Sequence, residues 1–513
     1  MNRLTLRNVF LIPLALAAST FSINSQSGNS EYEQWLKQTQ SEFQNYLDEN
    51  DKAFIGFLNK KWEEVDVEKT VKRDIKPKPL EMPIAEPISI TKTTPKVTEV
   101  EQEEKPIIIQ PINISKIIET KKNSPLDLEP DNSNKTITKT PTVKKDFNLR
   151  TAKFDFFGEK ISIEYHKKFK QTFRNKINNK NIASYWENLA TQPHKEIISQ
   201  LSETANALQL NDWGTALLFD QFARELQGSN QRNQSSRQLT SWFLLVKAGY
   251  NARIAYNDQI FLLMPSKQPL FSTTYFTLNN QRYYSVALNE KEMKPGKVFT
   301  YSGKHLDGQR NLDFSNPNNF IASSHKESRE LSFSYDGKQY NITISYPKDM
   351  INYFKTFPQL DLENYFSAGM PKETAFSLLT QLKPIVENQT ETEAVNRLLR
   401  FVQTAFEYKT DDDQFQQENY LFPLETLYYP YSDCEDRAAL FAWLTQSLLN
   451  LDAVIVDFPG HIATAVEFNS PTEGDSWEFN GKRYTMADPT YVNANVGMTM
   501  PQYQGIQPKM VTF

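Results

Sequence analysis

The chain has 513 residues, a formal net charge of −5 and a hydrophobic fraction of 39%. This length suggests about three domains, and the low hydrophobic fraction indicates that part of the chain is not packed into a core. The charge excludes the strongly basic composition of a nucleic-acid-binding protein, so no nucleic-acid partner is expected.

Residues 1–20 are typical of an export signal. Arg3 and Arg7 precede an apolar run from Val9 to Ala18 that ends in small residues. The run is too short to span a bilayer and fits a cleaved signal peptide, with an uncleaved membrane anchor as the alternative. We therefore expect a periplasmic or secreted protein of the bacterial cell envelope.

Residues 31–63 carry an 11-residue repeat of large apolar side chains. The three phases are Tyr32, Phe43 and Phe54; Trp35, Tyr46 and Phe57; and Leu36, Leu47 and Leu58. Eleven residues over three turns is about 3.67 per turn, which places these side chains on one stripe of a long helix. The stripe would pack on the protein itself or self-associate, or it would dock on a membrane surface or an envelope partner.

Residues 64–146 are predicted to form an extended linker. They hold ten of the 27 prolines and no glycine, which favours a rather stiff, extended chain.

From about residue 147 the pattern predicts a folded α+β protein. Residues 147–295 show helical patterns followed by short strands, and residues 296–365 are expected to be β-rich with a hairpin turn at Asp336-Gly337. Residues 370–513 contain two helices, a third that starts near Cys434, and several strands.

Cys434 is the only cysteine, so no intrachain disulfide can form. A lone thiol in an exported protein is a candidate nucleophile. Asp433 is a suitable N-cap for a helix that runs to about Leu449, which places Cys434 in its first turn. The free amides and the dipole at that end favour the thiolate.

A base and an orienting carboxylate follow at regular spacing. His461 is the only histidine downstream of Cys434, and it comes after a predicted strand and the turn Phe458-Pro459-Gly460. Asp488 comes after the next predicted strand, Lys482 to Met486. Successive elements of a helix-then-antiparallel-sheet unit can bring the three side chains together.

Three motifs here resemble those of the transglutaminase-like superfamily: Asp433-Cys-Glu-Asp-Arg-Ala438, Pro459-Gly-His461 and Ala487-Asp-Pro-Thr490. The resemblance implies a papain-like fold over about residues 370–495. It also implies that Cys434 is the nucleophile, His461 the general base and acid, and Asp488 the orienting carboxylate. The alternative for each residue alone is structural: a buried apolar thiol or a turn former.

One departure from the family concerns the oxyanion hole. Cross-linking members usually carry an oxyanion-stabilising tryptophan upstream of the cysteine, and here no tryptophan lies between Trp242 and Trp443. The hole would then use the Cys434 amide and a second donor such as Tyr431 or a nearby glutamine. This departure favours hydrolysis over cross-linking.

Residues 147–295 are a possible inactive copy of the catalytic unit. A shift of 201 residues aligns Ser241–Leu245 with Ala442–Gln446, Asn251–Ala255 with Asp452–Val456, and Leu278–Tyr283 with Phe479–Tyr484. Asn233 then falls opposite Cys434, Ala287 opposite Asp488 and, with one residue of slack, Gln259 opposite His461. Two unrelated α+β units with similar patterning are the alternative.

The expected function is thiol-dependent amide hydrolysis or acyl transfer on a protein or peptide substrate. The competing interpretation is a non-catalytic envelope adaptor with a vestigial fold. No cofactor and no metal site are expected: the other four histidines lack ligand spacing, and Asp411 to Asp413 is interpreted as a solvated loop.

Overall fold

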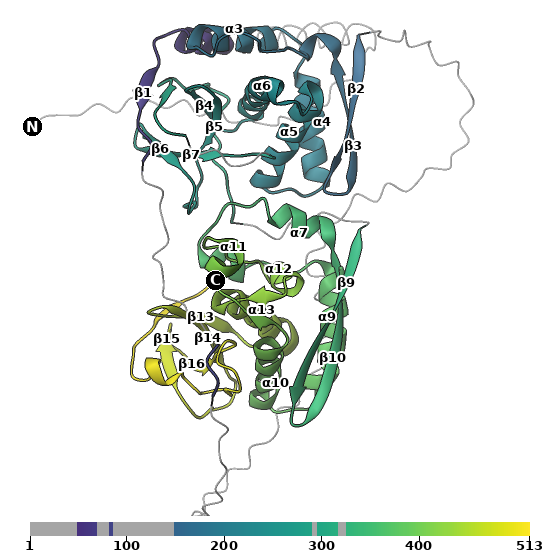
Figure 1. The fold of residues 1–513 in the computed structure, drawn as a ribbon, viewed down its shortest axis with the longest axis vertical. Helices are drawn as coiled ribbons and strands as arrows, with labels where there is room; N and C mark the ends of the chain where they lie inside the picture. The colour runs from purple at the N-terminus through teal and green to yellow at the C-terminus, as the bar shows by residue number, and fades with distance from the viewer. Residues whose placement is uncertain (1–48, 69–81, 86–147, 290–294, 316–324) are drawn as a thin grey trace, which may run out of the picture. The chain divides into compact units, whose positions relative to one another are not determined.

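The computed structural model describes residues 49–68, 82–85, 148–289, 295–315 and 325–513 (Figure 1). The predicted signal peptide and residues 31–48 of the predicted long helix lie outside the described residues. The chain divides into two compact units, Met1–Ala53 and Phe54–Phe513. Residues 49–53 of the first unit are helical, and all that follows concerns the second. Among the described residues, no helix combines the length and the apolar character needed to cross a membrane.

The start of the second unit belongs to the folded body. Helical structure continues to residue 58, and Phe54, Leu58 and Trp62 are buried, whereas Phe57 is 37% exposed. The Phe54 ring packs edge-on against the Trp186 ring with centroids 4.8 Å apart. The prediction that the helix reaches residue 63 is wrong, because residues 63–65 form a strand.

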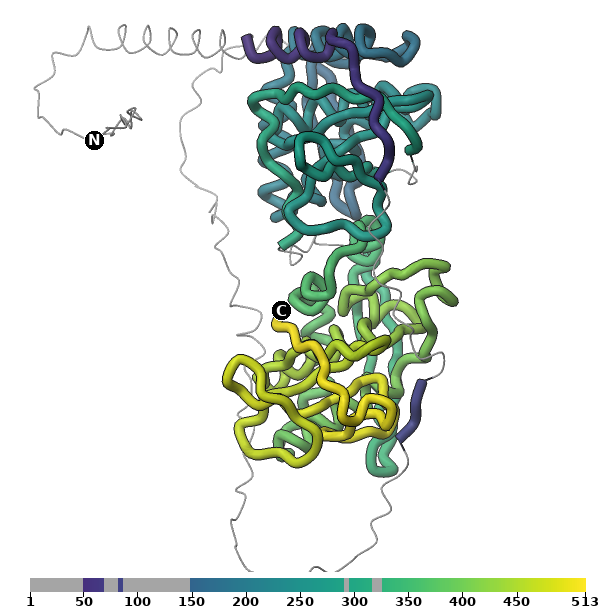
Figure 2. Tube along the Cα trace, turned by 90° about the vertical axis from the view of Figure 1, so that its left-hand side faces the viewer, coloured from purple at the N-terminus to yellow at the C-terminus, as the bar shows by residue number. Residues whose placement is uncertain are grey.

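Two parts of the predicted linker are ordered in the structure (Figure 2). Strand β1 (Glu63–Val65) pairs antiparallel with β8 (Val298–Thr300). Residues 82–85 lie beside Val492, where the Ala85 amide donates to the Val492 carbonyl at 2.7 Å and the Val492 amide donates to the Pro83 carbonyl at 2.9 Å. The linker prediction is therefore wrong for these residues, since an extended, proline-rich segment can still add backbone hydrogen bonds to a folded edge.

The first α+β region begins with a β-hairpin, continues with helices and ends in a six-stranded antiparallel sheet of order β1-β8-β4-β5-β7-β6. The elements are β2 (Leu149–Phe156), β3 (Glu159–His166), α3 (Asn179–Ala190), α4 (Lys195–Ala207), α5 (Asp212–Gln227), α6 (Gln234–Lys247), β4 (Arg253–Tyr256), β5 (Ile260–Met264), β6 (Tyr275–Leu278) and β7 (Gln281–Val286), followed by β8.

The second region repeats this plan: a hairpin, helices and then a five-stranded antiparallel sheet of order β15-β16-β14-β13-β17. Its strands are β9 (Lys326–Tyr335), β10 (Lys338–Pro347), β11 (Glu407–Tyr408), β12 (Tyr431–Ser432), β13 (Ala453–Phe458), β14 (His461–Glu467), β15 (Ser476–Phe479), β16 (Lys482–Ala487) and β17 (Lys509–Val511). Its helices are α7 (Lys348–Phe354), α8 (Leu362–Phe366), α9 (Lys372–Val386), α10 (Glu391–Thr404), α11 (Asp411–Phe415), α12 (Pro423–Tyr428) and α13 (Cys434–Leu449).

The β9–β10 hairpin follows directly from its sequence. Leu331, Phe333 and Tyr335 alternate with exposed residues, which buries one face of the ribbon. Asp336 and Gly337 both have positive φ (48° and 72°), as a two-residue hairpin turn requires. The mixed helix-and-sheet prediction is confirmed. Within the predicted β-rich stretch 296–365, the structure has strands β8, β9 and β10, and the helices α7 and α8 follow them.

The two sheets agree in order and partly in register. In the first sheet, four strands that follow a helix lie in the order β4-β5-β7-β6. In the second sheet, the corresponding strands lie in the order β13-β14-β16-β15. The pairing Tyr275↔Tyr284 becomes Ser476↔Thr485 under a shift of 201 residues, which is the observed pairing of β15 with β16.

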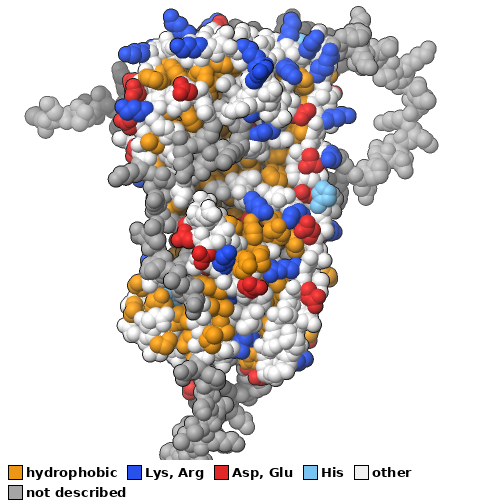
Figure 3. All heavy atoms as spheres, viewed as in Figure 1, with side chains coloured by type: hydrophobic (Ala, Val, Ile, Leu, Met, Phe, Trp, Pro, Cys, Tyr) orange, Lys and Arg blue, Asp and Glu red, His pale blue; other side chains and the backbone are white. Residues whose placement is uncertain are grey.

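Charged side chains of both signs and apolar side chains are interspersed on the face shown in Figure 3.

Candidate active site

Cys434 is the first residue of α13, and Asp433 is the N-cap as predicted. The backbone amide of Asp433 donates to Oδ2 of Asp436 at 3.3 Å, which closes the start of the helix. The thiol therefore lies at the positive end of the helix dipole, where a negative charge is stabilised.

His461 and Asp488 are in direct contact. Nε2 of His461 lies 2.8 Å from Oδ2 of Asp488, and both side chains are fully buried. Oδ1 of Asp488 accepts the amides of Thr490 (2.8 Å) and Tyr491 (3.2 Å). Because a carboxylate accepts at Nε2, the neutral imidazole keeps its lone pair on Nδ1. Nδ1 is buried and has no hydrogen-bond partner within the described part of the chain.

The sheet register positions this pair. His461 opens β14 directly after the hairpin turn, where it pairs with Phe458, and Gly460 provides the positive φ (81°) that the turn needs. Thr464 of β14 pairs with Ala487 of β16, so Asp488 leaves the sheet beside the start of β14.

Cys434 packs on this same part of the sheet. It shares a buried apolar cluster with Ile455 of β13, with Ile462, the neighbour of His461, and with Phe366 of α8. Tyr503 connects the groups further: its ring stacks on the His461 imidazole with centroids 5.5 Å apart and planes 10° apart. Burial raises the pKa of Tyr503, and negative charge on Cys434 and Asp488 raises it further, so both lie within electrostatic reach of the Tyr503 hydroxyl.

The thiol itself is enclosed. Cys434 is 1% exposed, and its Sγ donates to Oε2 of Glu435 at 2.9 Å. In this contact the proton stays on Sγ and points toward the Glu435 carboxylate. The sequence pattern did not predict a carboxylate partner for the thiol.

Arg437 ties the start of α13 to the end of α10. Its fully buried guanidinium donates to the carbonyl of Gln403 (3.0 Å), in the last turn of α10, and to that of Phe406 (2.9 Å), two residues after the helix ends. Burial lowers the pKa of Arg437 to about 10, against the opposing effect of nearby negative groups, so it stays charged at neutral pH. Gln403 in turn donates to the backbone carbonyl of Asp488 at 3.0 Å.

Several buried carboxylates gather near the start of α13. Oxygens of Asp411, Glu418 and Glu435 lie within 4.8 Å of one another, as do those of Asp411, Asp433 and Asp436. Carboxylate oxygens are the ligands that hard divalent cations prefer, so these residues could hold such an ion. Asp411 is 2% exposed and begins α11, so the interpretation of its run as a solvated loop is wrong for Asp411.

The positions opposite the predicted triad differ in setting in the first region. Asn233 is the N-cap of α6, as Asp433 is of α13. Gln259 is exposed and Ala287 is half-buried. The structure does not identify a second oxyanion donor: Tyr431 is half-buried in β12, and Nε2 of Gln403 already donates to the carbonyls of Asp488 and Ala494.

Comparisons with protein-family models, with curated proteins and with solved structures found no match to this chain.

Proposed function

We propose that this chain is a thiol-dependent amide hydrolase or acyl transferase that acts on protein or peptide substrates. The observation that carries the proposal is the buried His461–Asp488 pair at 2.8 Å, on a sheet that packs against the helix bearing Cys434. An imidazole that is oriented by a carboxylate and lies near a thiol at a helix N-terminus is the arrangement that nucleophilic catalysis needs.

Each residue has a defined part in the proposed reaction. Nδ1 of His461 accepts the thiol proton, and the Cys434 thiolate attacks the carbonyl carbon of an amide. Asp488 accepts a hydrogen bond from Nε2–H and stabilises the imidazolium that forms. His461 then gives its proton to the leaving amine, and water or a second amine releases the acyl group from the thioester.

The three linked motifs that resemble the transglutaminase-like superfamily support the same chemistry, and residues 1–20 support an exported, envelope-located enzyme. We further infer that the first region is a copy of the catalytic one without a triad. The shared strand order and the matching register of β6–β7 and β15–β16 support this duplication.

The test uses pooled internally quenched peptides with full-length protein. His461→Ala should lower cleavage or transfer by about 10²–10⁴-fold, because proton transfer is lost. Gln259→Ala changes the exposed position opposite His461 in the first region and is the matched control, which should leave the rate unchanged. Cys434→Ala must abolish activity; unchanged turnover in that variant would overturn the mechanism.

One observation favours the second candidate, a non-catalytic envelope adaptor. The Cys434 thiol is 1% exposed and donates to Glu435, as expected of a structural cysteine. The pH profile of alkylation of the folded protein by a small reagent, iodoacetamide, separates the two proposals. An alkylation rate that stays high down to mildly acidic pH indicates a stabilised thiolate. An alkylation rate that decreases once the pH is below about 8.5, the ordinary pKa of a thiol, favours the adaptor.

A further inference from the structure

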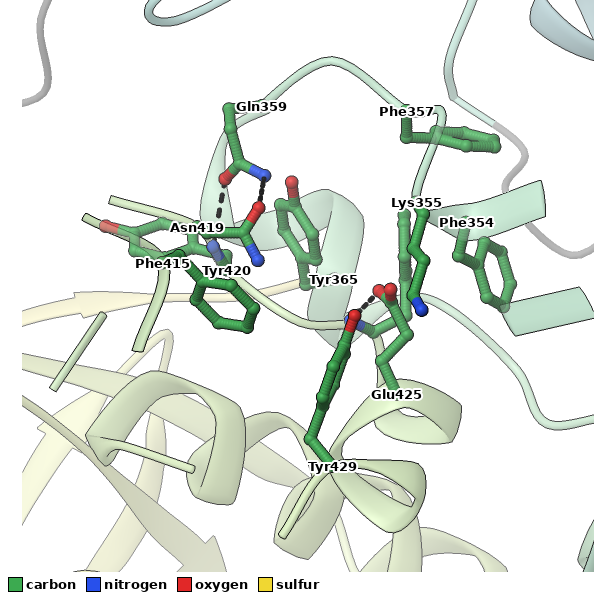
Figure 4. Close-up of a pocket in the computed structure, with 11 residues that line it drawn as sticks. Phe354, Lys355, Phe357, Gln359, Tyr365, Phe415, Asn419, Tyr420, Glu425 and Tyr429 are labelled. Atoms are coloured by element: carbon green, nitrogen blue, oxygen red, sulfur yellow. Dashed lines mark hydrogen bonds between the residues drawn. The ribbon is translucent and has the colours of Figure 1, made fainter. Parts of the chain in front are cut away.

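The second region contains a cavity that neither the triad nor the sheet explains. It has a volume of about 160 Å³ and is lined largely by aromatic rings (Figure 4). A cavity of about 150 Å³ is enough to bind benzene. The space therefore admits one six-membered ring.

The walls suit an aromatic ring in particular. Phe415 and Tyr429 meet edge-on with centroids 5.4 Å apart, and Tyr365 lies against Phe422 at 4.6 Å. In Figure 4, the rings of Tyr365, Phe415 and Tyr429 lie around the same space, and the Tyr429 hydroxyl points toward Glu425. A ring placed there would gain offset or edge contacts with several aromatic faces, which aliphatic groups do not make.

The polar groups of the cavity disfavour a cationic guest. The Glu425 carboxyl is 4% exposed and accepts the Phe422 amide at 3.2 Å, and burial raises its pKa to about 8, so it is mostly neutral at pH 7. Lys355 also lines the cavity, and its ammonium lies 5.4 Å from the centre of the Tyr429 ring. A cationic guest would therefore be repelled by the Lys355 ammonium without a carboxylate to compensate its charge.

The cavity adjoins the candidate active site through two segments. Tyr365 lines the cavity, and the next residue, Phe366, packs in the cluster that contains Cys434. On the other side, Phe422 lines the cavity, and the preceding Leu421 amide donates to Asp436 of α13 at 2.9 Å.

The catalytic region has this cavity because of an extended connection. In the first region residues 228–233 join α5 to α6, whereas in the second residues 405–433 join α10 to α13 and end at Cys434. More than half of the cavity's lining residues belong to this longer connection. The region that carries the triad thus has an added wall that the region without it lacks.

We propose that this cavity is a substrate subsite that takes the uncharged aromatic side chain of a peptide, phenylalanine or tyrosine, close to the bond that Cys434 attacks. The assignment rests on the proposed function for its role, but the binding of a ring does not depend on turnover.

The experiment measures binding in full-length protein that carries Cys434→Ala, with N-acetyl-phenylalanine methylamide and its alanine counterpart as probes. The phenylalanine probe should bind about ten- to a hundredfold more tightly, as expected from burying one ring. In the same background, Phe415→Ala should weaken its binding by roughly two- to tenfold. The matched control Phe376→Ala removes a 53% exposed ring that does not line the cavity and should change nothing.

The outcomes separate the two proposals. If both probes bind equally and the wild type still shows Cys434-dependent peptide cleavage, the subsite proposal is overturned and the proposed enzymatic function stands. Selective, Phe415-dependent binding without Cys434-dependent turnover of any aromatic peptide overturns the substrate role and the proposed function together. Because the comparison of probes needs no change to the cavity, a poorly folded Phe415 variant does not decide the result.

Discussion

Replacing Glu425 by Gln should stabilise the protein at alkaline pH. A glutamate carboxyl in water has an ordinary pKa of 4.5, and the burial of Glu425 raises its pKa in the folded state to about 8. Between these values the folded state holds a proton that the unfolded state has released, so the free energy of unfolding falls by about 1.4 kcal/mol per pH unit. Over about 3.5 units the wild type therefore loses roughly 5 kcal/mol as an upper bound, and this loss is complete above about pH 8.

Glutamine removes this titration and keeps the local structure. Its amide oxygen can still accept the Phe422 amide, which Oε2 of Glu425 accepts at 3.2 Å. The Glu425→Gln variant should thus unfold at nearly the wild-type temperature near pH 4.5 and several degrees above it at pH 9.

The assay is a thermal unfolding series from pH 4.5 to 9 for wild type, Glu425→Gln and the control Glu187→Gln. Glu187 is exposed on α3, so its replacement should not change the pH dependence. A difference between Glu425→Gln and wild type that is the same at every pH would show that Glu425 titrates normally and would refute the reasoning.

Three further predictions concern the site and its supports. Asp488→Asn should lower turnover by about 10²–10⁴-fold with little change in melting temperature, because the amide keeps the shape but cannot stabilise the imidazolium; an unchanged rate would contradict the role of Asp488. Arg437→Met should cost about 3 kcal/mol in urea unfolding, because the carbonyls at the end of α10 lose their donor; a neutral effect would show that they find other partners. Phe54→Ala should destabilise by about 3–5 kcal/mol, whereas Phe57→Ala, at a position 37% exposed, should cost about 1 kcal/mol or less; equal effects would contradict the packing of this segment.

Local chemistry explains why much of the fold was predictable. β5 (Ile260–Met264) is one of the short strands expected in residues 147–295, because a short, continuous apolar run between turn residues is typical of a buried strand. The hairpin at Asp336-Gly337 follows from two residues that accept positive φ. His461 and Asp488 lie at strand ends that alternate with turns, so their meeting follows from strand order alone.

Other features depend on tertiary structure that no local pattern carries. α7 has seven residues, which is too short for a helical period to stand out beside the strand before it. Tyr503 contacts the imidazole from a short 3₁₀ helix, Pro501–Tyr503, 42 residues after His461, and no motif marks it. Asp411 is polar in sequence yet buried in space, because its carboxylate accepts the Asn419 amide at 2.7 Å. The aromatic cavity combines three separate segments.

The burial of Cys434 turns the only thiol of the chain into a reporter of its own stability. A thiol that is 1% exposed reacts with a bulky reagent chiefly when the structure around it opens. If opening and closing are fast relative to labelling, the ratio of the native to the unfolded labelling rate gives the opening equilibrium directly. The wild-type chain thus carries a single built-in probe of local unfolding at the start of α13, with no added label and no competing cysteine.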